Sequence, residues 1–269
     1  LYMGLAAPLW GLSAGLTSVV GSDYPSEMLD ALAERGIDLT GIRSISGPGL
    51  RTWLLYEGDV RRVVHRLKGA THRTASPTIS DFPTQWHPRA IHLAPMPIDH
   101  QKTLIHGLRS RFGKEVILSL DPFEVLTEEN LGDWRDLASE IDLLFLSEDE
   151  LPSILQHSDP VPMLRRIIPA SLEALIFKRG SRGGLALCDR GSQILEWTVQ
   201  EVEVKDTTGA GDSFTVGVLA ALLQNQTLQR ALEWGAVSAS VAVEGHGAIA
   251  LLQATGQLIR NRLERRLGS

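Results

Sequence analysis

The chain has 269 residues, 43% of them hydrophobic and 22% charged, a balance typical of a globular domain with one large core. Its net charge of -6, without any basic run that carries interleaved aromatic residues, argues against a nucleic-acid-binding protein. No apolar stretch is long and clean enough to span a bilayer, so we expect no membrane partner. The single cysteine, Cys188, excludes a disulfide framework and fits a reducing compartment, which predicts a cytoplasmic protein.

Apolar strand-like runs alternate with helical patterns along the chain, which predicts an α/β fold whose mainly parallel sheet is covered on both faces. The expected strands are 16–20, 91–94, 115–120, 141–146 and 174–178, with helices that include 25–35 and 101–111. An antiparallel pair, 185–188 and 193–199, is expected across the turn at 189–191. Helices near 228–243 and 250–267 follow, and we expect a single domain over residues 1–269.

Residues 50–67 interrupt this alternation. Two β-prone runs, 51–56 and 60–67, flank the turn Glu57-Gly58-Asp59, and this pattern predicts a β-hairpin. A hairpin inserted early in an α/β chain is a candidate lid over a binding site. The alternative is an edge hairpin that extends the main sheet.

The most informative segment is Asp206-Thr-Thr-Gly-Ala-Gly-Asp-Ser-Phe214. An alternating run at 197–204, expected to be a strand, precedes it, and an apolar run with helical spacing at 215–223 follows it. A strand, then Gly209-Ala210-Gly211, then a helix is suited to holding an anion. The glycines let backbone N–H groups converge, and the helix start adds about half a positive charge.

Asp212 follows this candidate anion hole directly. A carboxylate beside an anion site is unfavourable unless it has a function, and the evident function is to accept a proton from a hydroxyl that attacks a bound phosphate. The alternative is a simple helix N-cap. The segment is not a phosphate-binding loop of the Walker type, because no Lys-Ser/Thr follows the glycines, and Phe214 stands at the third glycine position of a dinucleotide fingerprint.

The segment resembles the C-terminal signature D-T-x-G-A-G-D of the ribokinase-like (PfkB) carbohydrate kinase family. Similarity to that family's motifs extends to 16–25 with 35–38, to Asp121-Pro122, and to segments 147–150, 178–183 and 242–248. The resemblance implies a ribokinase-like three-layer sandwich with a mainly parallel central sheet and a small β lid. It also implies ATP and Mg²⁺ as cofactors, with K⁺ as an additional one.

Site residues beyond the signature follow from the same resemblance. Glu150 would help to hold Mg²⁺ together with Ser147, which stands where the family usually has Asn. The expected nucleotide-binding residues are Lys178, Gly180, Ser181 and Gly183 in one segment and Ala242, Gly245 and Gly247 in another. Asp206 and Thr208 would supply oxygens to a monovalent cation. The structural alternatives are a helix N-terminus at 147–150, a tight turn at 180–183 and turn capping at 206–208.

The function that we expect is ATP-dependent transfer of the γ-phosphate to a hydroxymethyl group of a sugar or nucleoside. The alternatives are a kinase of the same fold that acts on a vitamin precursor, and a catalytically silent nucleotide-binding regulator. A homodimer through the lid is a further expectation. The eight histidines show no ligand spacing, so no zinc site is predicted.

The N-terminal region departs from the family pattern. The resemblance implies an initial strand and a sugar-binding segment upstream of Leu1, and Tyr2 stands where the family often has Asn. Without that strand, we expect open edges on its neighbours and an exposed apolar face formed by residues such as Leu5, Leu9 and Trp10.

Overall fold

A six-stranded sheet forms the centre of the molecule. The computed structural model describes residues 1–57, 60–65, 68–152 and 159–268. The strands are β5 (Ala90–Leu93), β6 (Ile117–Leu120), β7 (Leu143–Ser147), β8 (Ala174–Lys178), β9 (Gly184–Cys188) and β10 (Gln193–Trp197), in the order β10-β9-β8-β7-β6-β5. β5 to β8 pair in parallel and β8 to β10 pair antiparallel. The mainly parallel sheet and the antiparallel pair expected from the sequence are confirmed.

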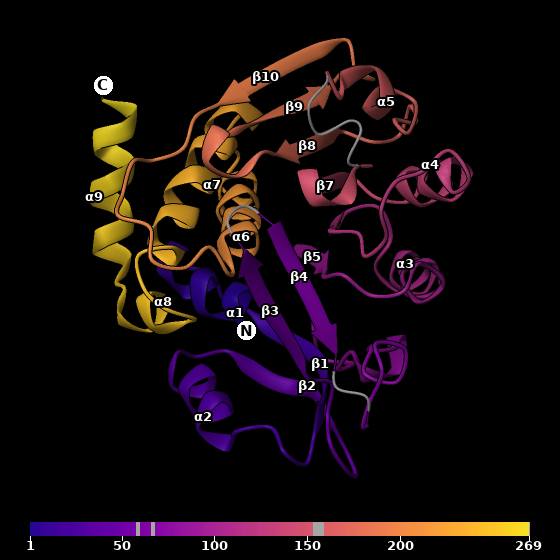
Figure 1. Cartoon of the computed structure of the whole chain (residues 1–269), viewed down its shortest axis with the longest axis vertical. Helices are drawn as coiled ribbons and strands as arrows, with labels where there is room; N and C mark the ends of the chain where they lie inside the picture. Colours follow the sequence, from indigo (N-terminus) through magenta and orange to yellow (C-terminus); the bar gives the residue numbers. More distant parts are fainter. Residues whose placement is uncertain (58–59, 66–67, 153–158, 269) are drawn as a thin grey trace.

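Helices cover both faces of this sheet, as Figure 1 shows. One face carries α3 (Ile98–Phe112), α4 (Leu131–Ser139) and α5 (Val161–Arg165), and the other carries α6 (Ala210–Leu223) and α7 (Leu228–Ala242). Successive side chains of a strand point to opposite faces. Leu144 and Leu146 therefore pack with α3 and α4, whereas Leu143 and Phe145 pack with α6 and α7. This alternation produces the three layers.

The N-terminal part forms a second unit of structure beside the main sheet. Helix α1 (Tyr2–Ala6), η1 (Ala7–Trp10), strand β1 (Gly15–Gly21), helix α2 (Ser26–Glu34) and strand β2 (Asp38–Ile45) follow one another, and β1 pairs with β2 in parallel. The expectation that Leu5, Leu9 and Trp10 are exposed is wrong, because they are buried in a core cluster with residues of α6, α7, α8 and α9. The Trp10 ring stacks on Trp234 at 4.6 Å, and its Nε1 donates to Ser238 Oγ.

The hairpin expected at 50–67 is present as β3 (Thr52–Glu57) and β4 (Val60–His65), paired antiparallel. Within the described residues it forms its own two-stranded sheet, so it does not extend the main one. Turn residues 58–59 and residues 66–67 lie outside the described part of the chain. Residues 49–52, where the hairpin begins, line the same large cleft as Asp212, consistent with a lid.

Three expectations about element boundaries are wrong. Strand β10 ends at Trp197, and residues 198–204 form no strand; Val199 and Val204 are exposed rather than alternating with a buried face. Helix α6 begins at Ala210, five residues before the expected start. The single helix expected at 250–267 is divided into α8 (Ile249–Gln253) and α9 (Gly256–Leu267), because Thr255 is extended and its hydroxyl accepts a hydrogen bond from the Leu258 N–H, capping α9.

A cleft of about 1440 Å³ lies between β1 and β5. Within the described residues each of these strands pairs on one side only, β1 with β2 and β5 with β6. Residues of both strands line the cleft, together with Met3 of α1 and Val216 and Asp212 of α6. Open strand edges therefore face this space, and the additional strand expected from the sequence stays a prediction. In the described part of the chain, no helix combines the length and apolarity needed to cross a membrane.

Candidate active site

The carboxyl ends of three neighbouring strands bring polar side chains together at one edge of the sheet. Asp121 follows β6, Ser147 ends β7 and Lys178 ends β8, and Ser147 and Lys178 are directly paired in the strand register. In open α/β sheets, ligands bind outside the carboxyl ends of the strands. The sheet therefore positions these groups where a ligand site is expected.

Lys178 and Asp121 form an ion pair, with 2.8 Å between Nζ and Oδ1. The two side chains are only 12% and 10% exposed. Burial alone would lower the pKa of Lys178, but the carboxylates of Asp121, Glu150 and Asp212 outweigh it and raise the pKa above its ordinary value. Burial acts in the opposite sense on Asp121, where Lys178 and His92 together hold the pKa at about 2. The pair is therefore fully charged at neutral pH.

His92, on β5, extends this network. Its Nε2 lies 3.4 Å from Asp121 Oδ2, which is an electrostatic contact longer than an ordinary charge-assisted hydrogen bond. Its Nδ1 lies 2.9 Å from Ser119 Oγ on the neighbouring strand. No spacing or motif in the sequence singles out His92, and Asp121 stands out there only as part of a family motif. The available signal was that both stand on, or directly after, parallel strands near their carboxyl ends.

The start of α6 has the geometry of a narrow turn. Gly209 is the N-cap and has φ = 81°, a left-handed conformation that favours glycine. A Cβ atom at Gly209 would lie 2.0 Å from the Tyr2 ring, which covers this residue. The Ala210 N–H donates to the Thr207 carbonyl at 3.2 Å. Among the described residues, Gly211 and Asp212 form no such turn bond, and the first N–H groups of a helix lack acceptors within it.

Asp212 lies in the first turn of α6 and lines the large cleft. Burial raises the pKa of its carboxyl, the nearby Asp121 carboxylate adds to the effect, and Lys178 and His92 oppose it. A carboxylate whose pKa is raised is a better proton acceptor than an exposed one. The position and environment of Asp212 suit a general base that faces the cleft.

Glu150 belongs to the 3-10 helix η3 (Glu148–Glu150), which directly follows β7. It forms a capping box with Ser147, in which each side chain accepts from the other residue's backbone N–H. Burial raises the pKa of Glu150 to about 7, with Asp121 adding to the shift and Lys178 opposing it. Mg²⁺ prefers carboxylate oxygens and uses few protein ligands. A buried carboxylate near a second one fits such an ion.

Asp206 connects two segments that the sequence assigned to the site. One carboxylate oxygen accepts from the Thr208 N–H at 2.9 Å, and the other accepts from the Gly247 N–H at 2.8 Å. The Lys205 N–H also donates to the Val243 carbonyl at 2.8 Å. The loop that contains Gly245 and Gly247 is thus held beside the turn that begins α6. These bonds are the turn capping that the sequence left open as an alternative to a cation site.

The loop between β8 and β9 is a tight turn around η5 (Gly180–Arg182). Gly180 has φ = 56° and Gly183 has φ = 74°. A Cβ at Gly183 would lie 2.1 Å from the Trp197 carbonyl oxygen, so close approach of β10 also requires glycine there. Ser181, the residue after Gly180, is exposed on this loop. Lys178, at the end of β8, joins this loop to the ion-pair network, and Arg182 of the loop forms an ion pair with Glu148 of η3.

The structure therefore brings together part of the expected set. Lys178 contacts Asp121 and lies next to the start of α6, because a Cβ at Gly211 would be 3.3 Å from Nζ. The segment 242–247 is joined to Asp206, although Ala242 itself is buried at the end of α7. Among the described residues, no group of three or more His, Cys, Asp or Glu side chains has the arrangement of a metal site.

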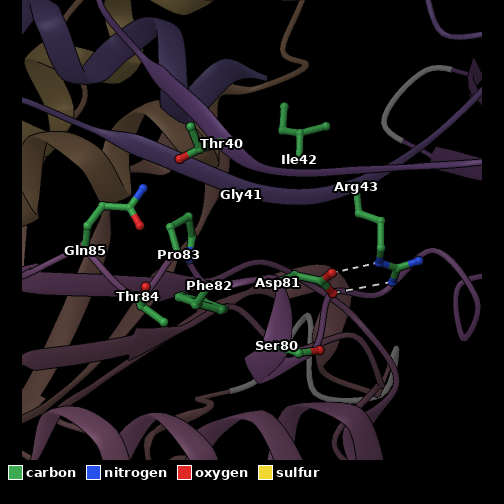
Figure 2. A pocket seen from close by; sticks show the side chains of 10 residues that line it. All are labelled: Thr40, Gly41, Ile42, Arg43, Ser80, Asp81, Phe82, Pro83, Thr84 and Gln85. Carbon is green, nitrogen blue, oxygen red and sulfur yellow. Dashed lines mark hydrogen bonds and ion pairs between the residues drawn. The ribbon is translucent and has the colours of Figure 1, made fainter.

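A second, smaller hollow of about 410 Å³ lies between β2 and η2 (Ile79–Asp81). Figure 2 shows Arg43 pointing toward Asp81, with 2.7 Å between Nε and Oδ1. Asp81 also accepts from the Thr78 N–H in a capping box. The two charged groups of this hollow are thus paired with each other, and none of the residues expected to act in catalysis lines it.

Solved structures of the same architecture show that the fold is ribokinase-like, and α6 carries an acidic residue in its first turn, directly after Gly209-Ala210-Gly211. The chain belongs to the pfkB family carbohydrate kinases, whose family model matches residues 5–255. It is therefore a phosphotransferase of the type whose acceptor is an alcohol group.

Individual relatives are distant. The chain is 24% identical over 233 residues to the cytidine kinase of Thermococcus kodakarensis, covering 86% of this chain and 81% of that one. It is 24% identical over 240 residues to the fructoselysine 6-kinase of Escherichia coli, covering 89% and 86%. A Burkholderia thailandensis nucleoside kinase, solved in complex with inosine, superposes with a TM-score of 0.78 at 16% identity and covers 100% of this chain and 87% of that one.

Proposed function

We propose that this protein transfers the γ-phosphate of ATP to a hydroxymethyl group of a nucleoside or sugar, with Asp212 as the general base. The observation that carries the proposal is the position of the Asp212 carboxylate. It lies in the first turn of α6, directly after Gly211 in the sequence, and lines the large cleft. A base in that position can accept the proton of a hydroxyl as it attacks a phosphoryl group held at the helix start.

The chain's own groups account for the other parts of the reaction. The Gly211 and Asp212 N–H groups, the free end of the α6 dipole, and the Lys178 ammonium stabilise charge on the transferred group. Ala210 contributes less than the sequence suggested, because its N–H is shared with the Thr207 carbonyl. Mg²⁺, held in part through Glu150 and Ser147, would neutralise the charge of the phosphates when bound. The loop 242–247 lies where it can contact the rest of the nucleotide, beside Asp206.

A nucleoside is the first acceptor to test. Among the relatives, one is a cytidine kinase and one was solved with inosine, whereas another acts on fructoselysine. The cleft of about 1440 Å³ exceeds the ordinary size of a small-molecule site and has room for either acceptor class. The alternatives of a vitamin-precursor kinase and of a silent nucleotide-binding regulator remain outcomes of the same test.

The test is a coupled assay of ADP release with a panel of nucleosides, sugars and vitamin precursors, using the wild-type protein and Asp212→Asn. Turnover with a nucleoside or sugar that Asp212→Asn abolishes supports the proposal. The exposed helix residue Asp30, replaced by Asn, serves as the matched control and should leave turnover unchanged. Nucleotide binding without turnover of any acceptor would favour the regulator and contradict the proposed activity.

The proposal includes a homodimer formed through the hairpin. Trp53 of β3 lies opposite Val64 of β4, and Leu55 is two residues farther along the same face; all three are close to half exposed. Burying such a face between two copies would be favourable. Sedimentation of the wild-type protein and of Leu55→Glu tests it: a dimer that the charge disrupts supports this interface.

We also place the kinase in the cytoplasm, where ATP is available and a lone cysteine stays reduced. Cys188 is partly exposed, rather than fully buried, and burial raises the pKa of its thiol. The proposal also includes a monovalent-cation site at Asp206 and Thr208, where both Asp206 carboxylate oxygens accept backbone hydrogen bonds. Comparing turnover in potassium and sodium salts tests it.

A further inference from the structure

The ion pair between Lys178 and Asp121 has no evident value as a stabilising contact. Both side chains are almost fully buried, and the desolvation of two charges offsets most of the attraction between them. Apolar residues of similar size would serve packing at least as well. A buried ion pair beside a catalytic carboxylate therefore calls for an explanation in terms of the ligand that the site receives.

Asp121 is held in place from three elements other than its own strand. Lys178 on β8 contacts one carboxylate oxygen at 2.8 Å, and His92 on β5 lies 3.4 Å from the other. Its backbone carbonyl accepts from Nε2 of Gln101, a residue of α3 that is only 1% exposed, at 2.9 Å. The Asp121 carboxylate is thus fixed in orientation before any ligand binds.

Lys178 in turn points at the start of α6. Its Nζ would be 3.3 Å from a Cβ at Gly211, so the ammonium lies against the first turn of the helix. It also lies 5.7 Å from the centre of the Phe145 ring, which packs beneath it in the core. Three carboxylates, those of Asp121, Glu150 and Asp212, act on the Lys178 charge. Of these, Asp121 is the one that Lys178 contacts directly.

We propose that Asp121 is a positioning residue, which holds the Lys178 ammonium at the first turn of α6 so that Lys178 receives the terminal phosphates of the nucleotide. The inference rests on the proposed kinase function and specifies how the Lys178 ammonium is held toward the phosphates in that site. Without Asp121, the remaining carboxylates near Lys178 would be Glu150 and Asp212, and pairing with Asp212 would occupy the general base. His92 supports the arrangement from the other side of Asp121.

Because of this arrangement, removing the Lys178 charge and removing the Asp121 charge should have different effects on nucleotide affinity. Lys178→Met deletes a cation that faces the phosphates, so affinity for a non-hydrolysable ATP analogue should fall on the order of 10–100-fold, as for a lost charge-assisted contact. Affinity for adenine, which lacks both the phosphates and the hydroxymethyl group of an acceptor, should not change. Asp121→Asn deletes an anion near the same phosphates, so analogue affinity should hold or rise while kcat falls at least about 10-fold, because Lys178 is no longer aimed.

The experiment measures calorimetric affinities for the ATP analogue and for adenine, kcat, and the thermal midpoint of each variant. The matched control is Asp142→Asn, which breaks another partly buried ion pair, with Arg109 at 2.8 Å. That pair lies at the amino ends of β6 and β7, where Arg109 also donates to the Val116 carbonyl, so its loss should lower the thermal midpoint and leave analogue affinity and kcat at wild-type values. A purely structural role for Asp121 would make its variant behave like this control.

Should Asp121→Asn fail to fold, Asp121→Glu carries the same test, because it keeps the charge and displaces it by one methylene. The expected result is then a lower kcat with analogue affinity within about threefold of wild type, since the net charge beside the phosphates is unchanged. Wild-type-like analogue binding by Lys178→Met in an active enzyme would overturn the inference alone. A wild-type protein that neither binds the analogue nor transfers phosphate would overturn the proposed function with it.

Discussion

Replacing Gly209 by alanine tests the turn on which the proposed site depends. Gly209 has φ = 81°, and its missing Cβ would lie 2.0 Å from Cδ1 of the Tyr2 ring. The left-handed conformation costs an alanine about 1–2 kcal/mol, and forcing the ring aside in a packed region costs about 1–3 kcal/mol more. We therefore expect Gly209→Ala to lower the free energy of unfolding by about 2–5 kcal/mol, a large part of the stability of an ordinary domain.

Two other glycines separate these contributions. Gly36 has φ = 77° with nothing within 4 Å of its added Cβ, so Gly36→Ala should lose only the conformational part. Gly132 lies in α4 with equally open space and no positive φ, so Gly132→Ala should gain up to about 1 kcal/mol. The measurement is urea denaturation of the three variants and the wild type.

Activity gives the second readout for Gly209→Ala. A shift of the turn displaces the N–H groups at the start of α6, and losing one preorganised donor lowers kcat by about 10²–10³. Equal destabilisation of Gly209→Ala and Gly36→Ala would show that the Tyr2 ring does not press on Gly209. Unchanged kcat in a destabilised Gly209→Ala would show that the phosphoryl group is held elsewhere.

Four further predictions follow from the geometry. Asp212→Asn should lower kcat by about 10²–10⁴ with little change in ATP affinity, and a variant that stays active would contradict its role as base. Gly211→Val should abolish turnover with the fold retained, because its side chain would begin 3.3 Å from Lys178 Nζ; thermal melts alongside the assay would reveal a folding defect instead. Burial would raise the pKa of Asp81, but the Arg43 ion pair and the hydrogen bonds outweigh it and lower the pKa. The stability that Asp81→Asn removes should therefore be fully present above the unfolded pKa of about 3.9 and be lost as the pH falls through the lower folded pKa. Urea denaturation of the wild type and the variant at a series of pH values measures this difference. The open edges of β1 and β5 should make the chain associate and melt at low temperature, which a monodisperse, thermally robust preparation would disprove.

Local sequence patterns predict most of the strands and helices, because the formation of each element depends mainly on residues close together in the sequence. Strand β7 is a short, buried apolar run between helical patterns, and such a run indicates a buried strand of a mainly parallel sheet. The glycines identify the turn at 206–212, but they do not show which of them is left-handed: Gly209 has that conformation, whereas Gly211 is helical and lies next to Lys178. The Tyr2 ring that covers Gly209 comes from the other end of the chain, so no local pattern reveals this contact.

The network of Asp121, Lys178 and His92 shows the same limit. The three residues come from three strands and are separated by dozens of positions, so no spacing connects them. The resemblance suggests Lys178 for a nucleotide loop, whereas its place against the start of α6 is a contact between β8 and a helix more than thirty residues later, which no local pattern indicates. The strand expected at 197–204 failed for a related reason: alternation favours a strand only where a neighbouring strand offers hydrogen bonds.

The single carboxylate of Asp206 joins the turn before α6 to the loop that contains Gly247. If these two segments contact opposite ends of one nucleotide, as proposed, the distance between them sets the length of the nucleotide that the site accepts. The side chain in Asp206→Asn would keep one acceptor oxygen and present an amino group to the other backbone N–H. One of the two hydrogen bonds would be lost, and the distance between the two segments would be less firmly fixed. The enzyme would then discriminate less well between donors that differ in the number of phosphates, with no residue in contact with the donor having changed.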